Sequence, residues 1–267
     1  MGEIIEFPDA KKARERIGAL RSELEKLFSE RDELICIICE NIEMQYMLLF
    51  GDLEYKLYKA YCKYLRLRRK KEMIQAKKNR KEPIRMKEIE AELDEEFRAY
   101  QTKLNEKMAD INRALERSEG RLLSEEDTAK LKKAYREIMK SLHPDLRPSV
   151  TEEEKKLFYH ATECYKNGDL ATMEMILSII GGKAQDDLLS DVLSMEKEIE
   201  RLETLTKSVR EEIDRVKKRP PYTWKIYVED EKKKSAKLRE LREDLRSYED
   251  AIRTQEESVA DLLREKK

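Results

Sequence analysis

A histidine, a proline and an aspartate follow one another at His143, Pro144 and Asp145. An imidazole and a carboxylate are groups that enzymes use for proton transfer, so this triplet is a candidate for chemistry. Hydrolytic catalysis would need more: a nucleophile with its base, or a second carboxylate. The chain has one other histidine, His160, and shows no Ser-His-Asp or paired-carboxylate arrangement. We therefore expect no enzyme activity, cofactor or bound metal.

The segment that precedes the triplet predicts a basic amphipathic helix. Its apolar residues recur at spacings of three and four, which places them on one face. They are Leu131, Ala134, Tyr135, Ile138 and Leu142. The positive residues Lys132, Lys133, Arg136 and Lys140 lie outside this face, and the last three continue the same spacing toward the triplet. Proline disfavours helix in the residue before it, so we expect the helix to end near Leu142.

A second helix is predicted after the triplet. Ser124-Glu-Glu-Asp127 and Thr151-Glu-Glu-Glu154 have the pattern of capping boxes, which predicts where the first and second helices begin. The second helix carries a recurring set of apolar and small residues: Phe158, Ala161, Cys164 and Tyr165.

Together these features resemble helix II, the loop and helix III of a J-domain, the module by which DnaJ-type co-chaperones engage DnaK-type chaperone ATPases. The resemblance implies that His143, Pro144 and Asp145 dock on the ATPase and stimulate its ATP hydrolysis, while the chain hydrolyses nothing itself. It implies a docking role for the basic residues Lys132, Lys133, Arg136 and Lys140. It also implies a core between the two helices: Leu131, Tyr135, Ile138, Leu142, Phe158, Ala161, Cys164 and Tyr165.

The flanks of this segment, which covers roughly residues 120 to 180, depart from the family. Glu119-Gly-Arg-Leu-Leu123 stands where a Tyr-x-x-Leu-Gly helix I is usual, so helix I is either absent or replaced by the end of the preceding long helix. The charged fourth helix is missing, and an apolar helix is expected from Leu170 to Ile180. The residues expected to cover the shared face of the two helices are Leu122, Leu123, Met173, Ile176 and Leu177.

Composition predicts an all-α, elongated protein. Charged residues make up 43% of the 267 residues, with seven Gly and six Pro, which is typical of long helices and coiled coils. The net charge of −1 predicts no general attraction to nucleic acid or to an anionic membrane. Without a recognised targeting signal or disulfide framework, we expect a cytoplasmic protein. Polar residues interrupt the most apolar stretch, Leu34 to Phe50, so we expect no membrane span.

Heptad spacing divides the chain into three expected regions. Residues 1–119 form an N-terminal helical or coiled-coil region, with a break at Phe50-Gly-Asp52 and a turn at Pro83; residues 120–181 form the J-like module. Residues 182–267 predict an antiparallel helical hairpin, because two heptad helices flank a connector with two prolines at 220 and 221. The alternative for these helices is pairing with a second copy of the chain.

Three other features have competing interpretations. Cys36-Ile-Ile-Cys39 has redox spacing, but both thiols fall on one apolar helix face, which favours seam packing. Residues 63–87 hold twelve Lys or Arg against two Glu, which predicts either a nucleic-acid or anionic-lipid patch or a helical hairpin neutralised by the acidic run at 88–96; we favour the hairpin. Tyr222, Trp224 and Tyr227 form either a partner contact or packing at a hairpin tip, and we favour packing.

The sequence therefore predicts a J-domain co-chaperone whose coiled-coil arms bind a client, a partner or a second copy. The main alternative is a structural coiled-coil scaffold with an inactive J-like module. A third function, nucleic-acid binding through residues 63–87, is the least favoured.

Overall fold

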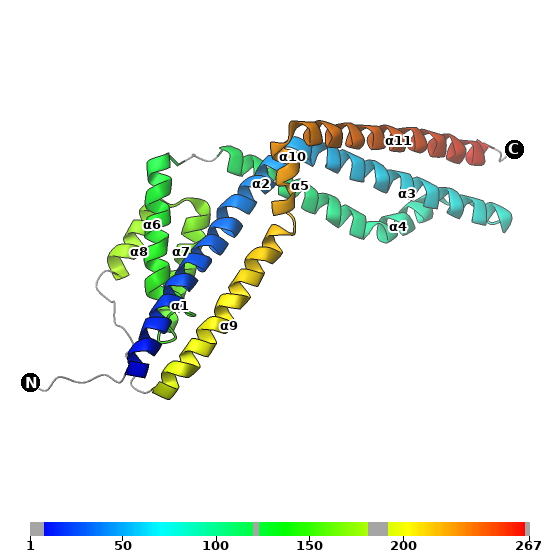
Figure 1. Ribbon diagram of the computed structural model, residues 1–267. Coiled ribbons are helices and arrows are strands. Elements are labelled where there is room, and N and C mark those ends of the chain that lie inside the picture. Colours follow the sequence, from blue (N-terminus) through cyan, green and yellow to red (C-terminus); the bar gives the residue numbers. More distant parts are fainter. Residues whose placement is uncertain (1–7, 120–122, 181–191, 265–267) are drawn as a thin grey trace, which may run out of the picture. The chain divides into compact units, whose positions relative to one another are not determined.

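The computed structural model describes residues 8–119, 123–180 and 192–264 (Figure 1). Within these ranges the chain is helical and contains no strand, which confirms the predicted all-α class. Its elements in chain order are α1 (Pro8–Glu33), η1 (Leu34–Cys39), α2 (Glu40–Tyr46), η2 (Met47–Gly51), α3 (Asp52–Asn79), α4 (Met86–Glu96), α5 (Arg98–Glu119), α6 (Glu125–Leu142), α7 (Glu152–Asn167), α8 (Leu170–Ile180), α9 (Val192–Lys217), η3 (Tyr222–Trp224), α10 (Lys225–Glu229) and α11 (Glu231–Arg264).

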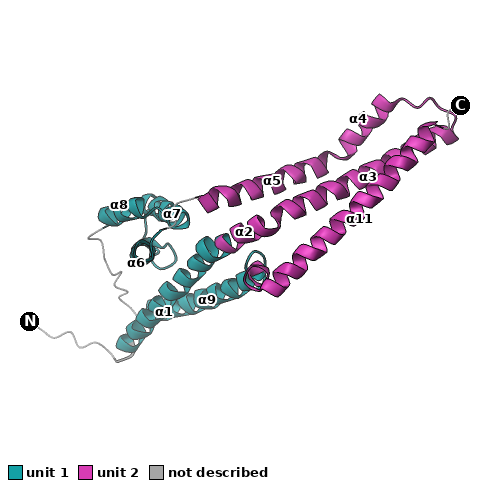
Figure 2. Cartoon of the chain, turned by 90° about the horizontal axis from the view of Figure 1, so that it is seen from above, with its two compact units in different colours: residues 1–40, 121–223 teal, residues 41–120, 224–267 magenta. Residues whose placement is uncertain are grey.

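The chain forms two compact units, shown in different colours in Figure 2. Unit 1 comprises residues 1–40 and 121–223, and unit 2 comprises residues 41–120 and 224–267. Each unit therefore combines two segments that are far apart in sequence. This division differs from the three consecutive regions that heptad spacing predicts.

In unit 1, α9 packs along α1 (Figures 1 and 2). Ion pairs flank the seam at a constant sequence separation of 187 residues, so the two helices run parallel. These pairs are Arg16–Glu203 at 2.7 Å, Glu23–Arg210, and Glu30–Lys217 at 2.8 Å. They recur every seven residues on each helix, the spacing at which flanking charges select the partner in a coiled coil.

In unit 2, α11 packs along α3 and also runs parallel to it. Tyr248 contacts Tyr61 and Tyr64 through ring edges, and further along both helices Ile74 and Val259 share one apolar cluster. The predicted antiparallel hairpin within 182–267 is therefore corrected: α9 pairs with α1, and α11 pairs with α3. The heptads identify an apolar seam on each helix but leave its partner unspecified.

The helix expected to break at Gly51 instead continues through it, from Ala10 to Asn79. Gly51 is buried and has helical backbone angles. A Cβ atom built there would lie 3.0 Å from Cγ1 of Ile111 on α5. The absence of a side chain thus allows α5 to approach, which is a packing role that sequence alone does not distinguish from helix breaking.

The J-like segment folds as three helices within unit 1. Ser124 caps α6 by accepting from the Asp127 amide at 3.0 Å, and Thr151 forms a capping box with Glu154 at the start of α7. Helix α7 ends at Asn167 and is followed by Gly168, which has a left-handed backbone conformation with φ of 72°. Both predicted helix starts are therefore confirmed, and the module is braced by elements described below.

Candidate docking site

The α6–α7 pair buries the face that the sequence predicts. Tyr135 and Tyr165 stack with ring centroids 4.2 Å apart, and Phe158 lies against Tyr135 at 6.4 Å. All eight expected core residues are buried: Leu131, Tyr135, Ile138, Leu142, Phe158, Ala161, Cys164 and Tyr165. The α6–α7 pair thus buries the core residues that the resemblance implies.

Part of the cover over this core comes from α8. Met173 and Ile176 are buried in the same cluster, and Leu123 and Leu177 are half-buried against it. Leu122, the fifth expected cover residue, lies outside the described residues.

The rest of the cover comes from the N-terminal end of the chain. Phe28 of α1 and Cys36 of η1 belong to the same buried cluster as the α6–α7 core. The end of the preceding long helix, α5, belongs to unit 2 instead, so of the two alternatives for helix I, replacement by that helix is wrong. Sequence reasoning missed α1 because nearly a hundred residues separate it from α6.

A buried polar network joins α1 to α6 and α7. The Tyr135 hydroxyl donates to Oδ2 of Asp32 at 2.7 Å and lies 3.3 Å from Oγ1 of Thr162. Asp32 is 5% exposed, and Arg31 pairs with its other carboxylate oxygen at 2.7 Å. Burial, with the negative charge of Asp32, raises the pKa of Tyr135 far above its ordinary value. The Tyr135 hydroxyl therefore remains a donor, and the carboxylate is satisfied from two helices.

His143 is buried at the end of α6. Its ring stacks on Phe28 with centroids 3.9 Å apart and meets the edge of Phe158 at 5.0 Å, which leaves 4% of the residue exposed. Burial lowers the pKa of His143 to about 3, and the positive charge of Arg31 lowers it further. The imidazole is therefore neutral at physiological pH.

The buried histidine organises the loop that follows it. Helix α6 ends at Leu142 as predicted, and the Asp145 amide donates to Nδ1 of His143 at 3.1 Å. The amides of Leu146 and Arg147 donate to the His143 carbonyl at 3.0 and 2.9 Å. An acceptor at Nδ1 requires the neutral ring with its proton on Nε2. His143 thus fixes the loop instead of lying on its surface, while Asp145 is exposed and Pro144 half-buried.

The basic side of α6 is divided between anchored and solvent-facing groups. Lys132 pairs with Glu33 of α1 at 2.5 Å, and Nε of Arg136 donates to the Ser29 hydroxyl at 3.1 Å. Arg136 nevertheless remains exposed, as do Lys133 and Lys140. The structure therefore brings three exposed cationic side chains and the exposed Asp145 carboxylate to one helix and the loop at its end.

The cysteines fit the seam interpretation. All four are buried thiols. Burial raises the pKa of the Cys36 thiol to about 11 and raises the pKa of Cys62 and Cys164 as well. A protonated thiol is a poor nucleophile and a poor metal ligand. Among the described residues, no cluster of His, Cys, Asp and Glu is arranged to hold a metal ion.

The basic segment 63–87 folds back on the acidic run that follows it. Arg66 pairs with Glu90 at 2.6 Å and with Asp94 at 2.7 Å, and Lys70 pairs with Glu90 at 2.5 Å. Arg69 reaches Glu96 at 2.8 Å. The predicted hairpin between α3 and α4 is therefore present, and it neutralises part of the local positive charge.

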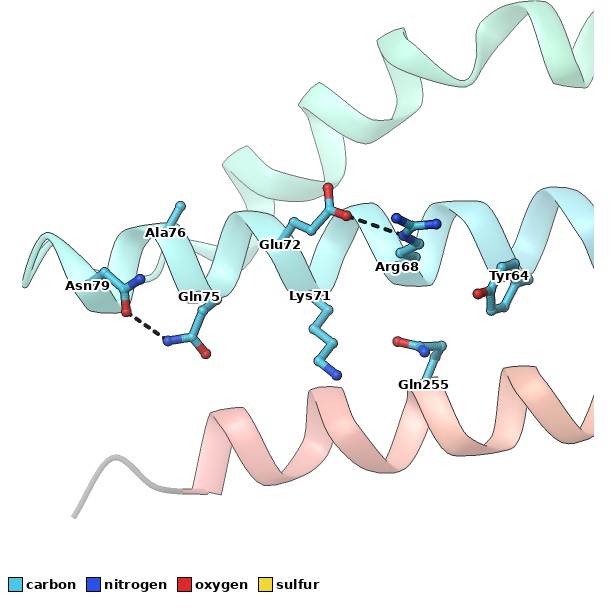
Figure 3. Close-up of a pocket in the computed structure, with 8 residues that line it drawn as sticks. All are labelled: Tyr64, Arg68, Lys71, Glu72, Gln75, Ala76, Asn79 and Gln255. Atoms are coloured by element: carbon cyan, nitrogen blue, oxygen red, sulfur yellow. Dashed lines mark hydrogen bonds and ion pairs between the residues drawn. The ribbon is translucent and has the colours of Figure 1, made fainter.

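An open groove of about 520 Å³ lies on α3 where α11 passes (Figure 3). It is lined by Tyr64, Arg68, Lys71, Glu72, Gln75, Ala76, Asn79 and Gln255. Arg68 is paired with Glu72 at 3.4 Å, and Gln75 donates to Asn79 at 2.8 Å. Two pairs of polar groups in the groove thus satisfy each other, while the buried Oε1 of Gln255 has no hydrogen-bond partner among the described residues.

The aromatic side chains of the connector are half-buried and pack against neighbouring helices. Trp224 stacks on Tyr46 with centroids 4.4 Å apart, and Tyr227 meets the same ring at 6.4 Å. Tyr222 is half-buried against the core of unit 1. These contacts support the packing interpretation over an exposed partner contact.

By length and composition, the helix from Ala10 to Asn79 contains one stretch apolar enough to cross a membrane, and 39% of that stretch is buried within the protein. Buried helices of soluble proteins have the same composition, so this finding is weak evidence. The polar interruptions between Leu34 and Phe50 are thus insufficient to exclude a span by composition. The absence of membrane contact stays a prediction.

Comparison of the chain with protein-family models, with curated protein sequences and with solved structures gave no match. The J-domain resemblance therefore rests on the sequence motifs alone and stays a prediction.

Proposed function

We propose that this protein is a co-chaperone that presents the Asp145 loop and the basic side of α6 to a DnaK-type chaperone ATPase and stimulates its ATP hydrolysis. The observation that carries the proposal is an exposed Asp145 carboxylate on a loop fixed by a buried histidine, at the end of a helix with exposed cationic groups. The protein itself supplies no catalytic group. Its expected location is the cytoplasm.

The roles of the three loop residues follow from their burial. His143 acts as a positioning residue, because its ring accepts the Asp145 amide and is sealed between Phe28 and Phe158. Pro144 restricts the loop before the encounter, which lowers the entropy lost on binding. Asp145 is the contact residue because its side chain faces solvent. A carboxylate on a rigid loop suits a guanidinium or backbone donor on the partner.

The exposed cations Lys133, Arg136 and Lys140 would steer and orient the encounter with an acidic surface. Exposed charges act over about a Debye length, near 10 Å at 0.1 M salt, so binding would be transient and salt-sensitive. The paired helices α1/α9 and α3/α11 are the arms that would bring a client or partner to the ATPase.

A second function, a structural scaffold with an inactive J-like module, is favoured by one observation. The apolar seam and the heptad ion pairs between α1 and α9 hold a long helical pair together without any use of the loop. The two functions differ in a single respect: a scaffold would leave the ATP hydrolysis of the chaperone unchanged.

Reversing two cationic side chains tests the docking surface. The double variant Lys133→Glu with Lys140→Glu should raise the concentration needed for half-maximal ATPase stimulation by about tenfold or more at low salt, because two attractions become repulsions. The difference should shrink strongly near 1 M salt, where the Debye length is about 3 Å. The measurement is steady-state ATP hydrolysis by the DnaK-type chaperone over a range of protein concentrations.

Lys156→Glu is the matched control, since Lys156 is exposed on α7. It should shift the half-maximal concentration less than twofold. If the double variant stimulates as well as this control at every salt concentration, the basic side of α6 is not the docking surface.

A further inference from the structure

A side chain from α9 contacts the loop between α6 and α7 that contains Asp145, which is called the docking loop below. Both terminal nitrogens of Arg201 donate to the carbonyl oxygen of Asp145, at 3.2 and 3.1 Å. The residues are 56 positions apart in sequence, so this contact is made by the fold and not by local geometry. Within the same loop, the His143 carbonyl accepts the amides of Leu146 and Arg147. The loop backbone is therefore held both by its own hydrogen bonds and by a side chain of α9.

Arg201 is itself held in place by a carboxylate one helical turn earlier. Its Nε donates to one oxygen of Glu198 at 2.7 Å, and Nη2 donates to the other at 2.9 Å. Glu198 also pairs with Arg21 of α1 at 3.4 Å, and its side chain is 13% exposed. A two-point contact of this kind orients the planar guanidinium, which leaves its outer edge directed at the loop.

We propose that Arg201 is a positioning residue for the docking loop, holding the Asp145 peptide group so that the neighbouring carboxylate faces the partner; this inference rests on the proposed function. Because Glu198 bridges Arg201 and Arg21, the position of the loop also depends on the pairing of α1 with α9. Three side chains, those of Arg21, Glu198 and Arg201, thus connect α1 to the Asp145 carbonyl. The J-like module gains in this way a brace that does not come from its own helices.

Arg201 could alternatively serve only to stabilise the pairing of α1 with α9, and a comparison with Arg210 distinguishes the two roles. Arg210 lies on the same helix and pairs with Glu23 of α1, so it joins the same two helices without touching the loop. Removing Arg210 reports the cost of losing one ion pair between α1 and α9. Any additional effect of removing Arg201 reports the contact with the loop.

The experiment compares Arg201→Ala, Arg201→Lys and Arg210→Ala in the full-length chain. The first readout is amide hydrogen exchange at Asp145, Leu146 and Arg147, which needs no chaperone. Arg201→Ala should accelerate exchange at these amides roughly fivefold, the effect of about one hydrogen bond, while exchange in the middle of α6 stays unchanged. Arg201→Lys should recover part of the protection because it keeps one donor. Arg210→Ala should leave the loop amides within about 1.5-fold of wild type.

The second readout is the stimulated rate of ATP hydrolysis at saturating protein. Arg201→Ala should lower it by roughly fivefold with partial recovery in Arg201→Lys, and Arg210→Ala should leave it unchanged. Equal loop exchange in Arg201→Ala and wild type, or equal acceleration by Arg210→Ala, would overturn the positioning role. If wild-type protein stimulates no hydrolysis, the co-chaperone function fails by itself, and the exchange rates still decide whether Arg201 holds the loop.

Discussion

Truncating Phe28 to alanine should lower the free energy of unfolding of unit 1 by about 3–5 kcal/mol, the usual cost of removing a buried aromatic ring. The Phe28 ring is fully buried and stacks on His143 at 3.9 Å. Its removal would open a cavity beside the imidazole and admit water. The pKa of His143 should then rise from about 3 toward its ordinary value of 6.5, because burial is the largest cause of the shift.

Phe97→Ala is the matched control, since Phe97 is half-buried in unit 2. It should destabilise unit 2 and leave the pKa of His143 unchanged. The measurements are urea unfolding followed by hydrogen exchange in α6, and titration of the His143 ring proton by NMR. If Phe28→Ala leaves both the stability of unit 1 and the pKa of His143 where they were, α1 does not seal the loop as described.

The second large effect is a loss of stability in acid caused by His143. The pKa of His143 is about 3 in the folded protein and 6.5 in its ordinary state. Between these values the unfolded chain binds a proton that the folded protein does not bind, so protonation favours unfolding. The contribution of the neutral, buried ring is therefore complete above about pH 6.5 and is lost progressively as the pH falls toward 3. A shift of this size corresponds to at most about 4–5 kcal/mol.

The comparison of wild type with His143→Gln isolates this effect, because titrating carboxylates contribute equally to both proteins. The difference in free energy of unfolding between the two should narrow as the pH falls from 7 to 4, by about 3 kcal/mol. Equilibrium unfolding at a series of pH values measures it. A difference independent of pH would mean that His143 titrates normally and is not buried in solution.

Local signals in the sequence were sufficient for much of the candidate site. The capping residues Ser124 and Thr151, the end of α6 before Pro144, and the buried stripe of α6 depend on interactions within a few residues. Their physical causes are helix periodicity, orphan amides at helix starts and the missing amide of proline. Such local causes can be recognised in the sequence without knowledge of the fold.

Long-range pairing was not predictable in the same way. The seam of α9 is equally suited to α1, to α11 or to a second copy, because an apolar heptad stripe has no unique partner. Only the matching charges at a separation of 187 residues distinguish α1 as the partner of α9. The positions of the apolar heptad residues do not contain this signal. The burial of His143 depends on another long-range contact, that of α1 with α6, since Phe28 comes from α1.

Two residues have a structural role that their amino-acid type does not indicate. Glycine often breaks a helix, yet Gly51 lies within a continuous helix and packs against Ile111. Asp32 is a charged residue, yet it is buried and accepts a hydrogen bond from the Tyr135 hydroxyl. In both cases the side chain, or its absence, is explained by a neighbour that lies far away in sequence.

Single-turnover ATP hydrolysis by the DnaK-type chaperone of the source organism tests the central claim most directly. It should be run with wild-type protein, with Asp145→Asn, and with Glu137→Gln as a control of the same charge change on exposed α6. Wild type and the control should stimulate hydrolysis equally. With Asp145→Asn the stimulated rate should be at least about tenfold lower, because the variant removes a charge that is desolvated on binding the chaperone and leaves the buried His143 in place. Absence of stimulation by wild type, or equal stimulation by Asp145→Asn, would contradict the co-chaperone function and leave the structural scaffold.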